Sequence, residues 1–153
     1  MPELLEYLTA ARVILLDATT KDAALAELID VLVRDEPSLD RQTLSDEIAK
    51  REAMMSTGIG NRLAIPHVRL TGAKSPAIAV GVSKAGIADY ESLDQQPVSI
   101  IVMIVAPAGE HDTYIRLLAR VADVLKDQEM RDAIIATDDT RTIHDILIGQ
   151  DAK

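Results

Sequence analysis

The chain contains one long apolar stretch, Val98–Ala106, in which only Ser99 is polar. A strand that is apolar at nearly every residue, rather than at alternate residues, is typical of a strand covered on both faces of its sheet. We therefore predict a buried strand over Val98–Val105 and a second strand over Ala77–Val82. A sheet with such a centre needs helices on both faces to keep the strand away from water.

Segments with helical periodicity lie on both sides of these strands in the chain. In the helix predicted over Lys21–Arg34, apolar side chains recur at Leu25, Leu28, Ile29 and Leu32. Further helices are predicted for a short N-terminal turn beginning at Pro2 and for residues 40–54, 110–126, 130–136 and 139–149, the last ending at Gly149; extended segments are predicted over 13–16 and 63–67. Interleaved strands and helices predict an α/β sandwich, and 153 residues fit a single domain over 1–153.

Composition excludes several classes of function. The chain has 25 acidic and 16 basic residues, a formal net charge of −9, so a broad nucleic-acid-binding face is not expected. Three Tyr with no Phe or Trp leave no stacking platform for single-stranded nucleic acid. Any phosphate chemistry must therefore be confined to a small local site, or the acidic surface must meet a basic partner.

The chain has no cysteine, which excludes disulfides, thiolate nucleophiles and thiolate metal sites and agrees with a reducing environment. Its first residues carry no basic segment of the kind that opens a secretory signal. The longest apolar stretch is far shorter than the ~20 residues of a membrane span. We therefore predict a cytoplasmic protein without membrane insertion.

The three histidines carry the side chains that titrate nearest neutral pH. His67 ends the extended segment that follows a glycine loop, and α/β folds place their sites at strand ends, although a histidine without a function there stays an alternative. His111 falls in the first turn of a predicted helix, where it is either a donor to a bound anion or an ordinary polar residue. His144 lies within a helix and is interpreted as a surface or packing residue.

The loop before His67 is rich in turn residues. Gly58, Gly60 and Asn61 tolerate positive φ, so the backbone can fold tightly beside His67 and its amide groups can converge on a small anion. Pro66 stiffens the approach and fixes the direction of the imidazole. Arg51 lies in the last turn of the preceding predicted helix, where the helix dipole favours a cation.

Other chemistries have weaker support. The histidines lack metal-site spacings such as His-x-x-x-His or Glu-x-x-His. Ser56 and Ser83 lack the Gly-x-Ser-x-Gly elbow of a serine hydrolase, and the chain has no Gly-Lys-Ser/Thr loop of a nucleotide triphosphatase.

The segment Arg51–His67, with the sequence REAMMSTGIGNRLAIPH, resembles the active-site signature of the type 2 enzyme IIA domains of the bacterial phosphoenolpyruvate-dependent phosphotransferase system. This mannitol/fructose class includes the nitrogen-regulatory enzyme IIA proteins. The later strand through Pro107, His111 and the helix after it are also similar, so the resemblance covers nearly the whole chain. It implies a three-layer α/β/α sandwich with a mixed central sheet of about four to five strands. Arg62 stands where many relatives have glycine, and we expect it to add a cation and bulk near the site.

The resemblance implies that His67 accepts a phosphoryl group from the phosphohistidine of the carrier protein HPr, with His111 and Arg51 as its active-site companions. Backbone amides of the loop would supply further donors to the phosphoryl oxygens; these residues are Ser56, Thr57, Gly58, Gly60 and Asn61. No metal or cofactor is needed, because the phosphoryl group arrives already activated on another histidine.

The resemblance implies an enzyme IIB or a regulatory target as the next acceptor. An alternative is a non-enzymatic regulatory interaction module whose partner binding is switched by the state of His67. A scaffold related to the cytoplasmic domains of anion transporters is a third alternative, against which the joint presence of His67, His111 and Arg51 argues. A homo-oligomer is compatible with the sequence.

Overall fold

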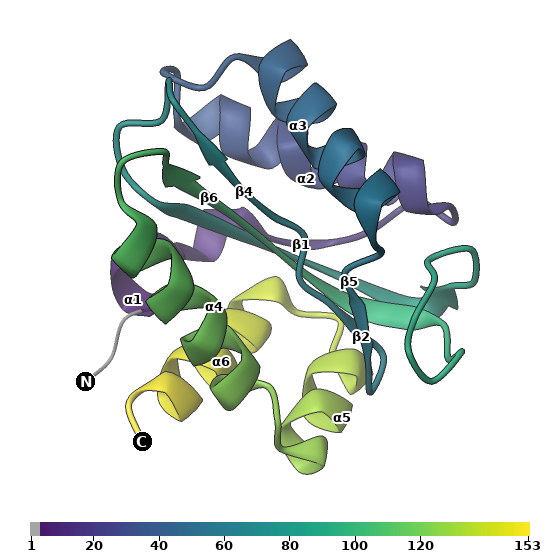
Figure 1. Ribbon diagram of the computed structural model, residues 1–153. Coiled ribbons are helices and arrows are strands. Elements are labelled where there is room, and N and C mark those ends of the chain that lie inside the picture. The colour runs from purple at the N-terminus through teal and green to yellow at the C-terminus, as the bar shows by residue number, and fades with distance from the viewer. Residues whose placement is uncertain (1–3) are drawn as a thin grey trace.

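The structure, a computed structural model, describes residues 4–153 (Figure 1). Pro2, expected in the first turn of the first helix, lies outside the described residues. Within them, six strands form one sheet in the order β1-β5-β6-β3-β2, and β4 also pairs with β6. The strands are β1 (Val13–Leu15), β2 (Gly58–Gly60), β3 (Leu63–Ala64), β4 (His67–Leu70), β5 (Ala77–Ile87) and β6 (Val98–Pro107).

The sheet is mixed. β1 runs parallel to β5, and β3 and β4 run parallel to β6, whereas the pairs β5–β6 and β2–β3 are antiparallel. The three-layer sandwich with a mixed sheet is thus confirmed, with six strands rather than four to five. The short strand β2 lies in a segment whose glycine and asparagine residues predict only a turn locally. Strand β3 falls within the extended segment predicted over 63–67, and it is held in the sheet by its pairing with β6.

Helices cover both faces of the sheet (Figure 1). One face is covered by α2 and α3, and the other by α1, α4, α5 and α6. The helices are α1 (Leu4–Tyr7), α2 (Lys21–Asp35), α3 (Arg41–Met54), α4 (His111–Val124), α5 (Gln128–Ala136) and α6 (Thr140–Asp151). Among the described residues, none of these helices is both long and apolar enough to cross a membrane.

Strand β6 explains why two helical layers are needed. Alternate residues Ile101, Met103 and Val105 belong to the core beneath α2 and α3. The residues between them, such as Ile100 and Ile104, belong to the core on the opposite face. Because successive side chains of a strand point to opposite faces, the continuous apolar stretch contributes to both cores at once.

His67 begins β4 rather than ending the segment before it, which corrects the position expected from sequence. Pro66 has no N–H group and interrupts the ladder between β3 and β4. Its carbonyl still accepts a hydrogen bond from the Ile104 amide at 2.9 Å, so the chain stays on β6 across the interruption.

Gly149 does not end the last helix, contrary to expectation. Helix α6 continues to Asp151, whose carboxylate accepts a hydrogen bond from the Leu4 amide at 2.8 Å and pairs with Arg120 at 2.6 Å. These tertiary contacts outweigh the weak helix propensity of glycine, which costs about 1 kcal/mol relative to alanine.

A pair of glycine substitutions tests the local packing. A Cβ on Gly58 would lie 2.1 Å from the backbone oxygen of Glu91, so Gly58→Ala should destabilise the fold by about 1–3 kcal/mol, as expected for overpacking. Gly149→Ala is the matched control, because nothing lies within 4 Å of its added Cβ and alanine favours a helix. Thermal and urea unfolding should show a lower Tm for the first variant and an unchanged or higher Tm for the second. Equal effects of both would contradict the close approach of Gly58 to Glu91.

Candidate functional site

The imidazole of His67 is held by a short hydrogen bond to the segment just before its strand. Nδ1 lies 2.6 Å from the backbone oxygen of Ile65. A carbonyl oxygen only accepts hydrogen bonds, so in the neutral ring the proton is on Nδ1 and Nε2 keeps a free lone pair. Pro66, between the two residues, fixes φ and limits how far this arrangement can relax.

The environment of His67 favours the neutral ring. Burial is the main cause that lowers its pKa from the ordinary value, and the nearby positive charge of Arg51 lowers it further. The Ile65 carbonyl and the negative charge of Glu52 act in the opposite direction, but the pKa remains lowered. At neutral pH the imidazole is therefore uncharged, as a nucleophile must be.

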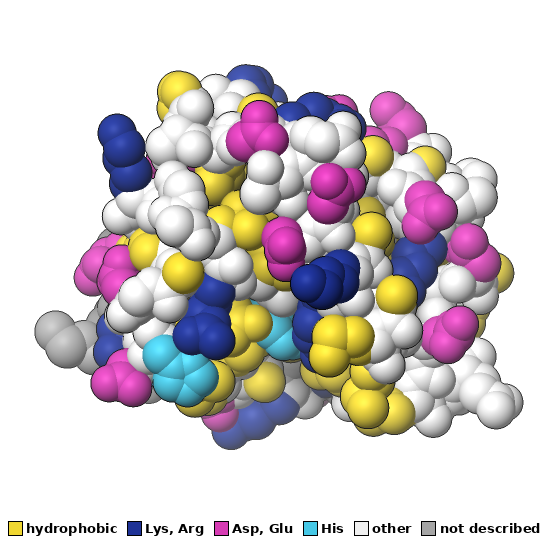
Figure 2. Space-filling model, turned by 45° about the horizontal axis from the view of Figure 1, so that its top comes forward, with side chains coloured by type: hydrophobic (Ala, Val, Ile, Leu, Met, Phe, Trp, Pro, Cys, Tyr) yellow, Lys and Arg dark blue, Asp and Glu magenta, His cyan; other side chains and the backbone are white. Residues whose placement is uncertain are grey.

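A cavity of about 370 Å³ opens beside His67. Its walls include three cations, Lys50, Arg51 and Arg69, and one acid, Glu47. The other lining residues are Met54, Val68, Ala108 and Tyr114. In a chain with a net charge of −9, this is a small basic site of the kind that a phosphoryl group requires. Figure 2 shows histidine side chains in cyan close to Lys and Arg side chains in dark blue on one face.

Arg51 is oriented by the end of its own helix. It lies in the last turn of α3, and its Nη1 donates to the backbone oxygen of Met55 at 2.9 Å. This bond uses one N–H of a guanidinium that has five, so the rest of the fork remains available for an anion. The helix end thus holds the guanidinium beside the imidazole.

Arg69 and Tyr114 line the cavity but were not identified from sequence. Arg69 is two residues after His67 on β4 and therefore lies on the same face of the strand. The Tyr114 ring centroid is 5.6 Å from that of His67, and the Arg69 guanidinium lies 5.5 Å from the Tyr114 ring. For Arg69, the available sequence signal was its position two residues after His67 along a strand. For Tyr114, the available signal was its position one helical turn after His111.

His111 is the first residue of α4, as expected, and its side chain is exposed. It is not among the residues that line the His67 cavity, although Ala108 and Tyr114, which flank it in the chain, are. The structure thus brings Arg51 to His67 and leaves His111 at the surface beside them.

The amide groups of the glycine loop already have acceptors within the protein. Their bonds are Thr57 N to Glu52 Oε1 at 3.1 Å, Gly58 N to Ser56 Oγ at 3.3 Å, Gly60 N to Ser92 Oγ at 3.0 Å and Asn61 N to Asp94 Oδ2 at 2.9 Å. No residue of this loop lines the His67 cavity. A phosphoryl-binding role for the loop stays a prediction, and it requires these amides to exchange their present acceptors for the phosphoryl oxygens.

Arg62 has a backbone φ of 64°, in the left-handed region that favours glycine. This conformation gives a physical reason for a glycine in related sequences. The guanidinium donates to Ser99 Oγ at 2.6 Å and does not line the His67 cavity. The structure therefore corrects the expectation that Arg62 adds its charge and bulk to the site.

The histidines do not form a metal site in the described part of the chain. No group of three or more His, Cys, Asp or Glu side chains there is arranged to hold a metal ion. His144 instead lies in α6, and its Nε2 is 3.1 Å from the Leu8 backbone oxygen, a contact that packs α6 against the N-terminal segment.

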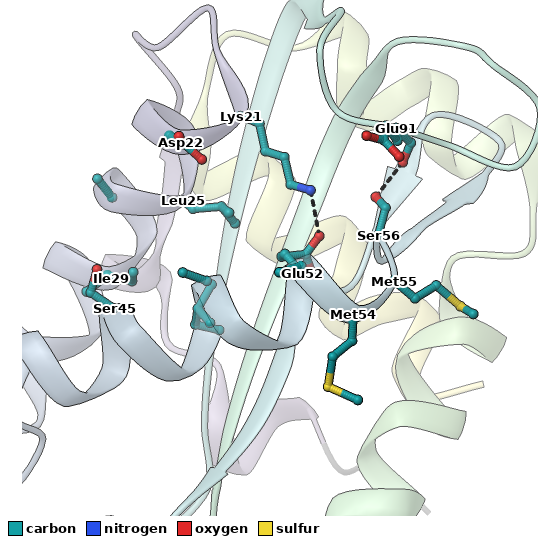
Figure 3. A pocket seen from close by; sticks show the side chains of 14 residues that line it. Lys21, Asp22, Leu25, Ile29, Ser45, Glu52, Met54, Met55, Ser56 and Glu91 are labelled. Carbon is teal, nitrogen blue, oxygen red and sulfur yellow. Dashed lines mark hydrogen bonds and ion pairs between the residues drawn. The ribbon is translucent and has the colours of Figure 1, made fainter.

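A second, larger cavity lies next to the first. It has a volume of about 660 Å³, is lined by residues of α2 and α3 together with Ser56 and Glu91, and shares Met54 with the His67 cavity (Figure 3). Met54 and Met55, at the end of α3, are 77% and 70% exposed. Their flexible side chains form an apolar rim between the two cavities.

Solved structures with the same fold support the architecture. The nitrogen regulatory protein IIA-Ntr from Neisseria meningitidis superimposes with a TM-score of 0.86 at 23% identity, covering 95% of this chain and 99% of that one. IIA mannitol from Escherichia coli superimposes with a TM-score of 0.77 at 19% identity, covering 92% of this chain and 98% of that one.

Sequence comparison identifies the family. A nitrogen regulatory protein of Pseudomonas aeruginosa is 30% identical over 84% of this chain and 83% of its own length. The fructose-specific EIIABC component of Bacillus subtilis is 36% identical over 89% of this chain, which spans 21% of that longer protein. Residues 6–149 match the family described as "Phosphoenolpyruvate-dependent sugar phosphotransferase system, EIIA 2". The chain therefore belongs to the EIIA 2 family of the phosphoenolpyruvate-dependent sugar phosphotransferase system, which confirms the resemblance carried by the Arg51–His67 segment.

Proposed function

We propose that the protein is a histidine phosphotransferase component in which His67 accepts a phosphoryl group on Nε2 from the phosphohistidine of an HPr-type carrier in the cytoplasm. The observation that carries this proposal is the neutral imidazole, bonded through Nδ1 to the Ile65 carbonyl, in a cavity lined by cations. Such a ring can attack phosphorus without first losing a proton.

The chemical step exchanges one nitrogen–phosphorus bond for another. The Nε2 lone pair of His67 forms a bond to phosphorus while the donor imidazole leaves with the electron pair of the bond that breaks. The acceptor ring becomes positively charged. It keeps its Nδ1 proton, and the Nδ1–H group stays hydrogen-bonded to the Ile65 carbonyl. That bond stabilises the charged ring, so it assists the reaction as well as orienting the nucleophile.

Cations around the cavity would bind the phosphoryl oxygens. Arg51 and Arg69 offer planar guanidinium groups, and Lys50 adds a third positive charge. Neither arginine forms an ion pair with a carboxylate among the described residues, so both can pair with the incoming anion. His111, at the exposed start of α4, is proposed as a further donor as the partner closes over the site.

The next acceptor is proposed to be an enzyme IIB or a regulatory target. A related structure is that of enzyme IIA mannitol in complex with phosphorylated enzyme IIB mannitol from Escherichia coli, which superimposes with a TM-score of 0.76 at 20% identity. The nitrogen regulatory relative of Pseudomonas aeruginosa supports a regulatory use of the same phosphoryl group. A purely non-enzymatic module is not favoured, because the cavity supplies both a nucleophile and anion-binding cations.

The identity of the acceptor residue is tested by phosphoryl labelling from phosphorylated HPr. The wild-type chain should take one phosphoryl group and His67→Ala none. His144→Ala is the matched control and should be labelled at the wild-type rate, since the His144 ring contacts the Leu8 carbonyl and Asp145 and does not line the His67 cavity. Labelling of His67→Ala at the wild-type rate would refute the assignment.

The role of the cations is tested by their removal one at a time. Arg51→Gln should slow transfer by about 100-fold, on the ~3 kcal/mol typical of a preorganised donor to a transition state. Arg69→Gln should also slow phosphoryl transfer. Arg62→Gln is the control, because its guanidinium binds Ser99 outside the cavity. Stopped-flow transfer rates that are unchanged in both cavity variants would remove these arginines from the site.

The pH dependence of transfer follows from the lowered pKa of His67. As the pH falls through that pKa, protonation occupies the Nε2 lone pair, so transfer should stay constant around pH 7 and decline only below the ordinary histidine value of ~6.5. Arg51→Gln removes a cation that lowers the pKa and should raise the NMR titration midpoint of His67. Lys84→Gln, at a cation paired with Asp138, should leave it unchanged. A wild-type midpoint at or above the ordinary value would contradict the burial argument.

A further inference from the structure

The cavity chemistry leaves one buried carboxylate unexplained. Glu52 follows Arg51 in α3, is 8% exposed, and does not line the His67 cavity. Figure 3 shows it among the residues that line the second, larger cavity, with its carboxylate directed toward Lys21. A buried charge is costly unless it is paired and hydrogen-bonded, so such a residue at this place requires a reason.

Glu52 is engaged by partners from two other segments. Lys21 Nζ, on α2, lies 3.0 Å from Oε1, and the amide and hydroxyl of Thr57 donate to the carboxylate at 3.1 and 2.5 Å. The Thr57 hydroxyl is also 2.8 Å from the hydroxyl of the buried Tyr90, whose ring lies 4.6 Å from Lys21 Nζ. Burial raises the pKa of Tyr90, so its hydroxyl remains protonated in this network.

Two further hydrogen bonds, both made by the backbone of Ile65, connect Thr57 to the imidazole. The Thr57 carbonyl accepts the amide of Ile65 at 3.1 Å. The Ile65 carbonyl in turn accepts Nδ1 of His67 at 2.6 Å. The carbonyl that accepts from Nδ1 is therefore connected to the Glu52 carboxylate through two hydrogen-bonded links, Glu52 with Thr57 and Thr57 with Ile65.

We propose that Glu52, held by Lys21, is a positioning residue for His67: by anchoring Thr57 it holds the Ile65 carbonyl against Nδ1 and so keeps the Nε2 lone pair directed at the cavity. The anchor is needed because the segment after Thr57 has little conformational preference of its own. It contains Gly58 and Gly60, and its pairing with β3 is irregular between them. The consequence for transfer rests on the proposed function, whereas the effect on the tautomer does not.

The test reads the tautomer directly in the unphosphorylated protein. In ¹⁵N spectra of the imidazole above its pKa, wild-type His67 should show a protonated Nδ1 and an unprotonated Nε2. The double variant Lys21→Met/Glu52→Leu replaces the buried pair by apolar side chains of similar size, a change that folded proteins often tolerate. It leaves Thr57 without its acceptor, and its spectrum should show both tautomers in exchange.

A milder variant keeps the test decisive if the double variant does not fold. Thr57→Val is close to isosteric but loses the 2.5 Å bond to Glu52 and the contact with Tyr90, and it should also show the second tautomer. Thr57→Ser keeps the hydroxyl and should restore the wild-type spectrum. A wild-type spectrum in Thr57→Val, or in a folded double variant, would overturn the proposal.

A structural control separates positioning from general loss of stability. Arg12 is also 8% exposed and pairs with Asp35 and Glu36 in a different part of the fold. Arg12→Met should lower the Tm while leaving the His67 tautomer unchanged. A tautomer change in Arg12→Met equal to that in Thr57→Val would show that lost stability alone is responsible and would refute the positioning role.

Transfer kinetics then connect the tautomer to the reaction. Thr57→Val should lower kcat for transfer from phosphorylated HPr about 10-fold, in line with the sensitivity of rates to misplaced groups, and leave KM within about twofold. If the wild-type protein accepts no phosphoryl group while the tautomer responds as described, the proposed function fails and the positioning role stands. If transfer occurs and the tautomer is insensitive, the positioning role fails alone.

Discussion

The burial of both faces of β6 is the constraint on which the rest of the structure depends. Its alternate side chains supply two separate cores, so two helical layers are required rather than one. The same strand pairs with β5 on one edge and with β3 and β4 on the other. His67 is held opposite Ile104 by this pairing, so its imidazole is attached beside the fully buried centre of the sheet.

The local charge at the site is opposite in sign to the net charge of the chain. The chain as a whole is acidic, yet three of the four charged side chains that line the cavity beside His67 are cations. Burial keeps the imidazole uncharged while the surrounding guanidinium groups remain charged. The proposed transfer would therefore bring a phosphoryl group to a neutral imidazole and to cations at the same place, which a uniformly basic surface would not provide without attracting nucleic acid as well.

Sequence reasoning predicted the elements whose signals are local. The helices α2, α3 and α6 begin within one residue of the starts predicted at 21, 40 and 139, and Thr20, Asp40 and Asp139 cap them. Strand β6 and the first six residues of β5 follow from their apolar residues, whereas the rest of β5, from Ser83 to Ile87, was not predicted. His67 and Arg51 were found through a motif, and they line one cavity. Arg69 was missed because the extended segment was predicted to end at residue 67, whereas β4 continues to Leu70. Tyr114 was missed because its ring contact with His67 joins two elements that are distant in the chain, β4 and α4.

The other failures have the same origin in distant contacts. On sequence grounds the loop amides could bind an anion, but in the structure those of Gly60 and Asn61 bind Ser92 and Asp94, which lie far along the chain. Another long-range hydrogen bond joins the two ends of the described chain: the Leu4 amide donates to the carboxylate of Asp151, the last residue of α6. Neither end lines the His67 cavity. The hydrogen bond that fastens Leu4 to α6 therefore stabilises the fold without occupying the entrance to that cavity.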